Sequence, residues 1–318
     1  MSTSTHRRKV DFASAGSRCA AWHYPGENGA CVIMAAGLGV IKEAGTDRFA
    51  KRFHDAGYSV LAFDYRRLGE SGGTPRQLVR IGEQLADWQA AIGFAATLPC
   101  VDRDKVAIWG FSVSGGHVFT VAARNPGLAA AIAHAPLADG LDAMRNALPH
   151  TTPLALARLT ARAAADTLGG MLGRDPLLVP LAGERGTVAS LTTPDSRNGA
   201  GALNPGNRYP HWQQTVAARS ALRVGFYRPG RFAPRIECPL LVVAYDDDGV
   251  APPEPAVRAA QRAPRGQLAR LPGGHYAAFL DAEGTTAHAL LTFLDREAAL
   301  GGPLPVPSRR KKPRHAGD

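Results

Sequence analysis

A serine on a turn of small residues carries the clearest chemistry in this sequence. Ser112 lies in the segment Gly-Phe-Ser-Val-Ser-Gly-Gly at 110–116, between an apolar run and a predicted helix. A nucleophilic serine on a sharp strand-to-helix turn needs small residues two positions away on either side, because larger ones would collide with the strand and the helix. Gly110 meets this requirement upstream, and Ser114 stands downstream where glycine is usual. Two alternatives remain open: Ser114 as the nucleophile in a register shifted by two residues, and an ordinary Gly/Ser turn.

A serine hydroxyl becomes a nucleophile at neutral pH only beside a base, and a histidine base needs a carboxylate that holds its tautomer. His275 follows two glycines after a predicted strand, and three consecutive aspartates follow the strand before it. We predict Asp248 as the acid, because Asp-Gly-Val-Ala-Pro at 248–252 forms a turn into the next helix. Asp246 and, more remotely, Asp139 are the alternatives. For His275 the alternative is a loop histidine that bonds only to the backbone.

Attack on a carbonyl carbon also requires two amide donors for the oxyanion of the tetrahedral intermediate. Val113, the residue after the nucleophile, would supply one of them. The turn Ala-Gly-Leu-Gly at 36–39 follows the first buried parallel strand, and we predict the Leu38 amide as the second donor. A purely structural turn at 36–39 is the alternative.

The spacing of apolar residues predicts a mostly parallel sheet with helices on both faces. Short apolar runs alternate with helical patterns in the order strand, helix, strand, helix, which is typical of this architecture. Two segments near the N-terminus, 10–14 and 19–24, alternate as an antiparallel hairpin that leads into the sheet. The predicted strands lie at 30–36, 58–65, 105–110, 128–136, 239–245 and 267–271, with helices at 48–56, 78–98, 117–124, 253–263 and around 287–298.

The strand and helix rhythm stops for about a hundred residues, which is too long for a connection within a compact domain. We interpret this stretch as a largely helical cap inserted over the site, with helices near 139–148, 153–173 and 211–222. The predicted organisation is a basic N-terminal tail at 1–9, a core at 10–136 and 238–300, the cap at 137–237, and a disordered basic C-terminal tail at 301–318.

Composition narrows the functional classes. The 318 residues are 45% hydrophobic and 20% charged, which allows a sizeable core. The four cysteines form no Cys-x-x-Cys pair, so we expect reduced thiols in a cytoplasmic protein and no metal site. No secretory signal is recognisable, and the longest apolar stretch, 30–41, is too short to span a membrane. Much of the net charge of +10 lies at the two ends without a nucleic-acid motif, so we expect no specific nucleic-acid partner.

With these segments in place, the chain resembles the α/β-hydrolase superfamily over roughly residues 10–300. More narrowly, it resembles the branch of dienelactone hydrolases and Xaa-Pro dipeptidyl-peptidase-type esterases, which includes polyketide acyltransferases and thiohydrolases. Phe-Asp-Tyr-Arg-Arg-Leu-Gly-Glu-Ser-Gly-Gly at 63–73 is similar to the Asp-Tyr-Arg-x-x-Gly-x-Ser loop of that branch. The branch often has His-Gly at the oxyanion turn, where this chain has Ala36 and Gly37. Ser114 is the second departure from the pattern of the branch.

The residues and the resemblance together predict an α/β-hydrolase fold and a serine hydrolase that cleaves an ester or thioester through an acyl-enzyme. The expected triad is Ser112, Asp248 and His275, with no metal or organic cofactor and a small acyl compound as substrate. An acyltransferase with the same triad is the alternative, and a catalytically silent binding protein is a third hypothesis. A homodimer is left open.

Overall fold

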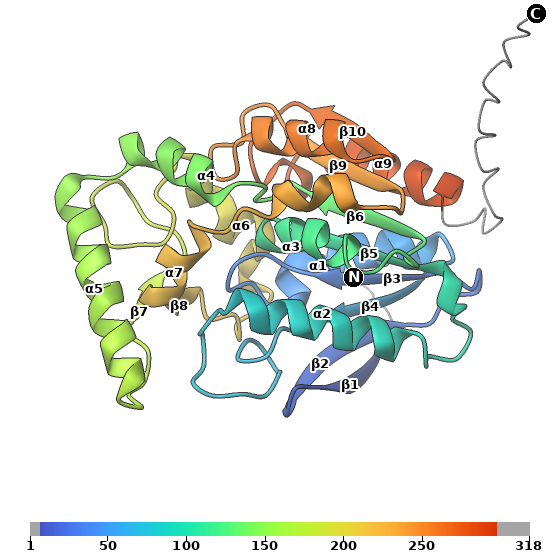
Figure 1. Cartoon of the computed structure of the whole chain (residues 1–318), viewed down its shortest axis with the longest axis horizontal. Helices are drawn as coiled ribbons and strands as arrows, with labels where there is room; N and C mark the ends of the chain where they lie inside the picture. The colour runs from blue at the N-terminus through green and yellow to red at the C-terminus, as the bar shows by residue number, and fades with distance from the viewer. Residues whose placement is uncertain (1–6, 298–318) are drawn as a thin grey trace, which may run out of the picture.

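The computed structural model describes residues 7–297 (Figure 1). Within them an eight-stranded sheet has the order β1-β2-β4-β3-β5-β6-β9-β10. The first two neighbour pairs, β1 with β2 and β2 with β4, are antiparallel, and every later pair is parallel. The predicted mostly parallel sheet is therefore confirmed. The strands are β1 (Arg8–Ser14), β2 (Ser17–Tyr24), β3 (Cys31–Ala35), β4 (Ser59–Phe63), β5 (Val106–Phe111), β6 (Ala130–His134), β9 (Leu240–Tyr245) and β10 (Gly266–Leu271).

The central strands are buried on both sides, which explains their continuous apolar sequences. Every residue of β3, β4, β5, β6 and β9 is buried. Helices α2, α3 and α8 cover one face of the sheet, and α1 and α9 cover the other (Figure 1). The fold predicted from the strand and helix rhythm is thus the observed one. The five helices are α1 (Lys42–Asp55), α2 (Ile81–Ala95), α3 (Val113–Ala122), α8 (Pro253–Arg262) and α9 (Glu283–Glu297).

The predicted N-terminal tail at 1–9 is wrong in its last two residues. Strand β1 begins at Arg8, and Lys9 lies opposite Trp22 in the hairpin. The Lys9 Nζ atom lies 2.5 Å from Glu70 Oε1, so this basic side chain has an acidic partner on the folded protein. Residues 1–6 and the predicted tail at 301–318 lie outside the described residues.

Within the segment 137–237, helices α4, α5 and α7 and strands β7 and β8 lie at one end of the molecule (Figure 1), whereas the 3-10 helix Pro229–Arg235 packs against α3 and α8 of the core. A helix predicted near 211–222 is wrong in its first half, because Thr215–Ala217 is strand β8, paired antiparallel with β7 (Leu178–Pro180). The Ala217 amide also donates to Gln77 O, which fixes this extended backbone against the core at 2.9 Å. The helices of the segment are α4 (Gly140–Ala147), α5 (Pro153–Met171), α6 (Gly199–Leu203) and α7 (Ala218–Val224).

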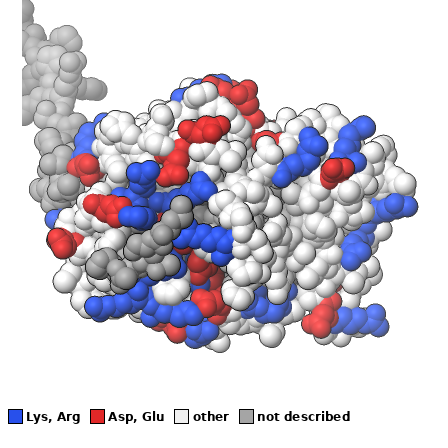
Figure 2. Space-filling view, turned by 180° about the vertical axis from the view of Figure 1, so that it is seen from behind, with Lys and Arg blue, Asp and Glu red and all other residues white. Residues whose placement is uncertain are grey.

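The surface carries charges of both signs. Figure 2 shows Lys and Arg side chains lying among Asp and Glu on one face. Ion pairs among the described residues include Arg52 with Glu283, at 3.0 Å, and Lys51 with Asp55, at 2.6 Å. Among residues 7–297, no helix combines the length and the apolar character that crossing a bilayer requires.

Candidate active site

The turn around Ser112 has the geometry that its sequence predicts. Ser112 links β5 to α3 with φ 60° and ψ −117°, a sparsely populated conformation for a residue with a side chain. A Cβ atom added to Gly110 would lie 2.2 Å from the Ser114 carbonyl oxygen, so only glycine fits there. The Ser112 amide donates to His134 O at 2.9 Å, which ties the turn to the neighbouring strand. The turn therefore holds the Ser112 hydroxyl above the carboxyl end of the sheet.

The structure brings the three predicted triad residues together. His275 Nε2 lies 2.9 Å from Ser112 Oγ, and His275 Nδ1 lies 2.7 Å from Asp248 Oδ2. The other carboxylate oxygen of Asp248 accepts from the amides of Val250 and Ala251, at 3.0 and 2.7 Å. Burial raises the pKa of Asp248, and the His275 ring and the Ala251 amide oppose that rise. This arrangement can hold the imidazole with one nitrogen toward the serine.

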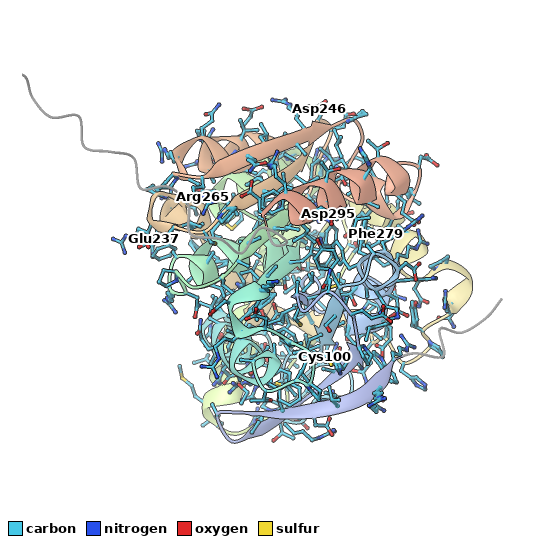
Figure 3. The ribbon with its side chains drawn as sticks, turned by 90° about the vertical axis from the view of Figure 1, so that its right-hand side faces the viewer. Cys100, Glu237, Asp246, Arg265, Phe279 and Asp295 are labelled. Atoms are coloured by element: carbon cyan, nitrogen blue, oxygen red, sulfur yellow. The ribbon has the colours of Figure 1, made fainter. Side chains whose placement is uncertain are left out.

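The alternative acids lie elsewhere. Asp246 is exposed and pairs with Arg270, and Figure 3 shows Asp246 at the outer edge of the molecule. Asp139 caps the N-terminus of α4, where it accepts from the Leu141 amide at 3.0 Å. Both carboxylates are therefore engaged in local structure away from His275.

Ser114 is buried and joins the serine turn to the predicted oxyanion turn. The Trp88 Nε1–H donates to Tyr65 OH at 2.8 Å, and the Tyr65 and Ser114 hydroxyl oxygens are 2.5 Å apart. Ser114 Oγ in turn donates to the carbonyl oxygen of Ala36. Burial raises the pKa of Tyr65 well above its usual value, so Tyr65 keeps the proton that it donates to Ser114. The Ser114 side chain thus attaches the serine turn to the oxyanion turn, through a backbone carbonyl that any residue at position 36 would supply.

The two predicted oxyanion donors belong to turns that border the nucleophile. Val113 is the first residue of α3, so its amide lacks a carbonyl partner within the helix. Gly37 lies against Ser112, since a Cβ added there would be 3.1 Å from the Ser112 Cβ. A residue of the segment 137–237 also fixes the turn at 36–39, because Trp212 Nε1 donates a hydrogen bond to Gly39 O at 2.9 Å.

Sequence reasoning missed one carboxylate of the site. Asp195 begins a short 3-10 helix within the inserted segment. Its Oδ2 accepts from the Gly249 amide at 2.9 Å and from the His275 amide at 3.3 Å. One side chain therefore braces both the loop that carries Asp248 and the loop that carries His275. No motif surrounds Asp195, and only the contact made by folding shows its place.

Two other histidines belong to the protein core. Burial lowers the pKa of His117 and of His134 to about 3, so both rings are neutral at physiological pH. His117 bonds to Gln84 at 2.9 Å, and His134 bonds to Tyr245 at 2.9 Å. Within residues 7–297, no cluster of three or more His, Cys, Asp or Glu side chains is arranged to hold a metal ion.

Two cavities meet at Ser112. The wide chamber has a volume of about 460 Å³, and the narrow chamber has a volume of about 100 Å³. Leu38, Ser112 and Leu191 line both of them. The serine hydroxyl is thus reachable by a molecule that has two unequal parts.

The sheet order, the strained serine turn and the chambers above it define an α/β hydrolase. Residues 26–283 match the family model described as "Hydrolase_4: Serine aminopeptidase, S33", and the chain belongs to this family. The solved structure of the α/β hydrolase GrgF from Penicillium sp. sh18 is similar in fold, with a TM-score of 0.77 and 24% identity over 92% of this chain and 99% of that one.

Curated relatives are named for hydrolysis, transfer and quorum quenching. The quorum-quenching protein AidA of Acinetobacter baumannii (strain MDR-ZJ06) is 40% identical over 271 residues, 84% of this chain and 87% of that protein. A thiohydrolase of Eupenicillium brefeldianum is 29% identical over 57% of this chain and 56% of its own length. The polyketide transferase ATR5 of Stachybotrys chlorohalonatus (strain IBT 40285) is 27% identical over 78% of this chain and 82% of its own. These relatives confirm the resemblance to the branch with polyketide acyltransferases and thiohydrolases.

Proposed function

We propose that this protein is a serine hydrolase that cleaves an ester or thioester through an acyl-enzyme. The observation that carries the proposal is the hydrogen-bonded line from Asp248 through His275 to Ser112 Oγ, with distances of 2.7 and 2.9 Å. Such a line activates a hydroxyl that is otherwise a weak nucleophile at neutral pH. In this proposal the segment 137–237 acts as the cap over the site. The four cysteines form no Cys-x-x-Cys pair, which favours a cytoplasmic protein.

In the first half-reaction Ser112 Oγ attacks the carbonyl carbon while His275 Nε2 accepts the hydroxyl proton. Asp248 stabilises the imidazolium, and the amides of Leu38 and Val113 stabilise the oxyanion. His275 then gives its proton to the leaving oxygen or sulfur as the bond to the carbonyl carbon breaks. In the second half-reaction water attacks the carbonyl carbon of the acyl-enzyme while His275 takes its proton. The bond from that carbon to Ser112 Oγ then breaks, His275 returns the proton to Ser112, and the carboxylic acid leaves.

An acyltransferase is the second candidate, in which an alcohol or amine replaces water in the second half-reaction. Two observations favour keeping it: the ATR5 relative is named a polyketide transferase, and the wide chamber has room for an acceptor beside Ser112. Product analysis with a butanoyl thioester and added alcohols distinguishes hydrolysis from acyl transfer. Acyl transfer that outpaces hydrolysis would make the acyltransferase the better description.

The nucleophile is tested by intact mass after incubation with a fluorophosphonate. We expect one adduct on the wild type and on Ser114→Ala, and none on Ser112→Ala. Loss of the adduct only in Ser114→Ala would move the nucleophile by two residues, and an unlabelled wild type would favour a binding protein. The substrate panel is then p-nitrophenyl butanoate, butanoyl thioester and an N-acyl-homoserine lactone, the last because one relative is named a quorum-quenching protein.

A further inference from the structure

We infer that the narrow chamber binds the acyl group of the substrate and that the wide chamber binds its leaving group. The inference rests on the proposed function, since it divides an ester or thioester at the carbonyl carbon that Ser112 attacks. It adds a substrate class: a short, straight, apolar acyl group joined to a larger and more polar alcohol or thiol.

The narrow chamber has an apolar wall built by one face of a helix. Gly140, Ala143, Met144 and Ala147 of α4 line it, at the i, i+3, i+4 and i+7 spacing of a single helix face. Val224 of α7 lines it as well, and none of its lining residues is charged. The hydroxyl residues Ser190, Thr192 and Thr193 also line the chamber. A charged group would lose its hydration here and find no opposite charge in return, so an aliphatic chain is the favoured occupant.

The volume of the narrow chamber limits the length of that chain. An apolar protein cavity of about 150 Å³ holds benzene, which has six carbon atoms. The narrow chamber of about 100 Å³ therefore holds roughly four carbon atoms. A butanoyl group fits it, whereas an octanoyl group exceeds it.

The wide chamber lies on the side of the base. Phe111 and Tyr276 line this chamber, and their rings lie 5.0 and 4.9 Å from the His275 ring, measured between centroids. His275 must deliver its proton to the leaving oxygen or sulfur, so the leaving group departs on the side that these rings define. The charged side chains Glu184 and Arg197 also line the wide chamber, which suits a polar group.

Leu38 and Leu191 separate the two chambers. Both side chains line both cavities, and Leu38 belongs to the oxyanion turn. Leu191 is fixed by backbone hydrogen bonds, from its amide to Leu181 O at 2.9 Å and from the Gly183 amide to its own carbonyl at 3.0 Å. A substrate thus places its carbonyl at this partition, with one substituent on each side.

The test compares two series of esters. The first varies the acyl group from acetyl to octanoyl on a constant p-nitrophenol, and the second varies the alcohol from ethanol to naphthol on a constant butanoyl group. Ala143→Leu fills the narrow chamber and Ala200→Phe narrows the wide one. The control, Ala157→Leu, changes an exposed alanine of α5 that lines neither chamber.

In the wild type we expect kcat/KM to fall at least about tenfold from butanoyl to octanoyl, the size of effect that an ill-fitting methylene group produces in an apolar pocket. Ala143→Leu should lower kcat/KM for butanoyl about tenfold and leave acetyl within about threefold. Ala200→Phe should lower kcat/KM for the naphthyl ester and leave kcat/KM for the ethyl ester unchanged. Ala157→Leu should match the wild type in both series.

Two results would overturn this inference. An acyl-length profile that responds to Ala200→Phe and not to Ala143→Leu would reverse the assignment of the chambers. Equal responses of both series to both variants would mean that the cavities do not divide the substrate. Fluorophosphonate labelling of Ser112 separates these failures from failure of the proposed function, because the labelled serine would remain in either case.

Discussion

Replacing Ser114 with alanine tests whether its hydroxyl, which stands where the family usually has glycine, contributes to stability and activity. The substitution removes the hydroxyl between Tyr65 OH and Ala36 O, so one buried donor and one buried acceptor lose their partner. A buried polar group left without a partner costs about 1–3 kcal/mol, so the loss of two partners should lower the free energy of unfolding by about 2–6 kcal/mol. The turn that carries the Leu38 amide also loses its attachment to the serine turn.

Activity should fall together with stability. Loss of one oxyanion donor typically costs about 10²–10³ in kcat, and a misplaced donor costs part of that. We therefore expect kcat for p-nitrophenyl butanoate to drop about tenfold in Ser114→Ala, with KM nearly unchanged, because a ground-state carbonyl depends less on the donor. Tyr65→Phe breaks the same chain of hydrogen bonds one step earlier and should lower kcat in the same direction.

Urea unfolding and steady-state kinetics of both single variants and the double variant measure the effect. The two substitutions act on one hydrogen-bond chain, so a coupling free energy of about 0.5–3 kcal/mol is expected between them. Ser59→Ala is the matched control, because Ser59 is also buried and accepts one hydrogen bond, from the Gly26 amide at 2.9 Å. Ser59 is the first residue of β4, whereas the triad lies at the carboxyl ends of the strands. Ser59→Ala should cost stability and leave kcat unchanged. A Ser114→Ala protein within about 0.5 kcal/mol of the wild type and with unchanged kcat would refute the reasoning.

Two further substitutions test the surroundings of the site. Asp195→Ala removes the brace between the two triad loops, so the rate of fluorophosphonate labelling and kcat should both fall about tenfold, as expected for a lost positioning contact; an unchanged labelling rate would exclude that role. Burial acts to raise the pKa of Glu70, but hydrogen bonds from Lys42 and Lys9 outweigh it and lower that pKa to about 2. Because a depressed carboxyl pKa stabilises the fold only while the group is ionised, Glu70→Gln should destabilise the protein in urea at pH 6, and this difference should shrink as the pH falls from 4.5 toward 2. A destabilisation independent of pH would show that the carboxylate charge contributes nothing.

Local sequence predicted the core of the fold because each central strand is apolar without interruption. A strand buried on both faces has no polar side to interrupt it, and β3 and β5 therefore stand out from the helices beside them. The turn at Ser112 was predictable for the same local reason, since the steric limits on Gly110 act within a few residues. The candidate acid and base followed from the chain order of loops at one edge of a parallel sheet.

The rest depends on contacts that only folding creates. Thr215–Ala217 is extended because it pairs with β7 and meets Gln77 of the core, whereas the residues around it permit a helix. Asp195 lies 80 residues from His275 and 54 from Gly249, so no spacing rule joins it to either loop. Ser114 and Ala36 each look like a loss when compared singly with the family pattern. The Ser114 hydroxyl bonds to the backbone carbonyl of residue 36, which any residue there would supply. Ser114 therefore has a role in positioning the oxyanion turn that a comparison of single positions does not show, and this role is independent of the Ala36 side chain.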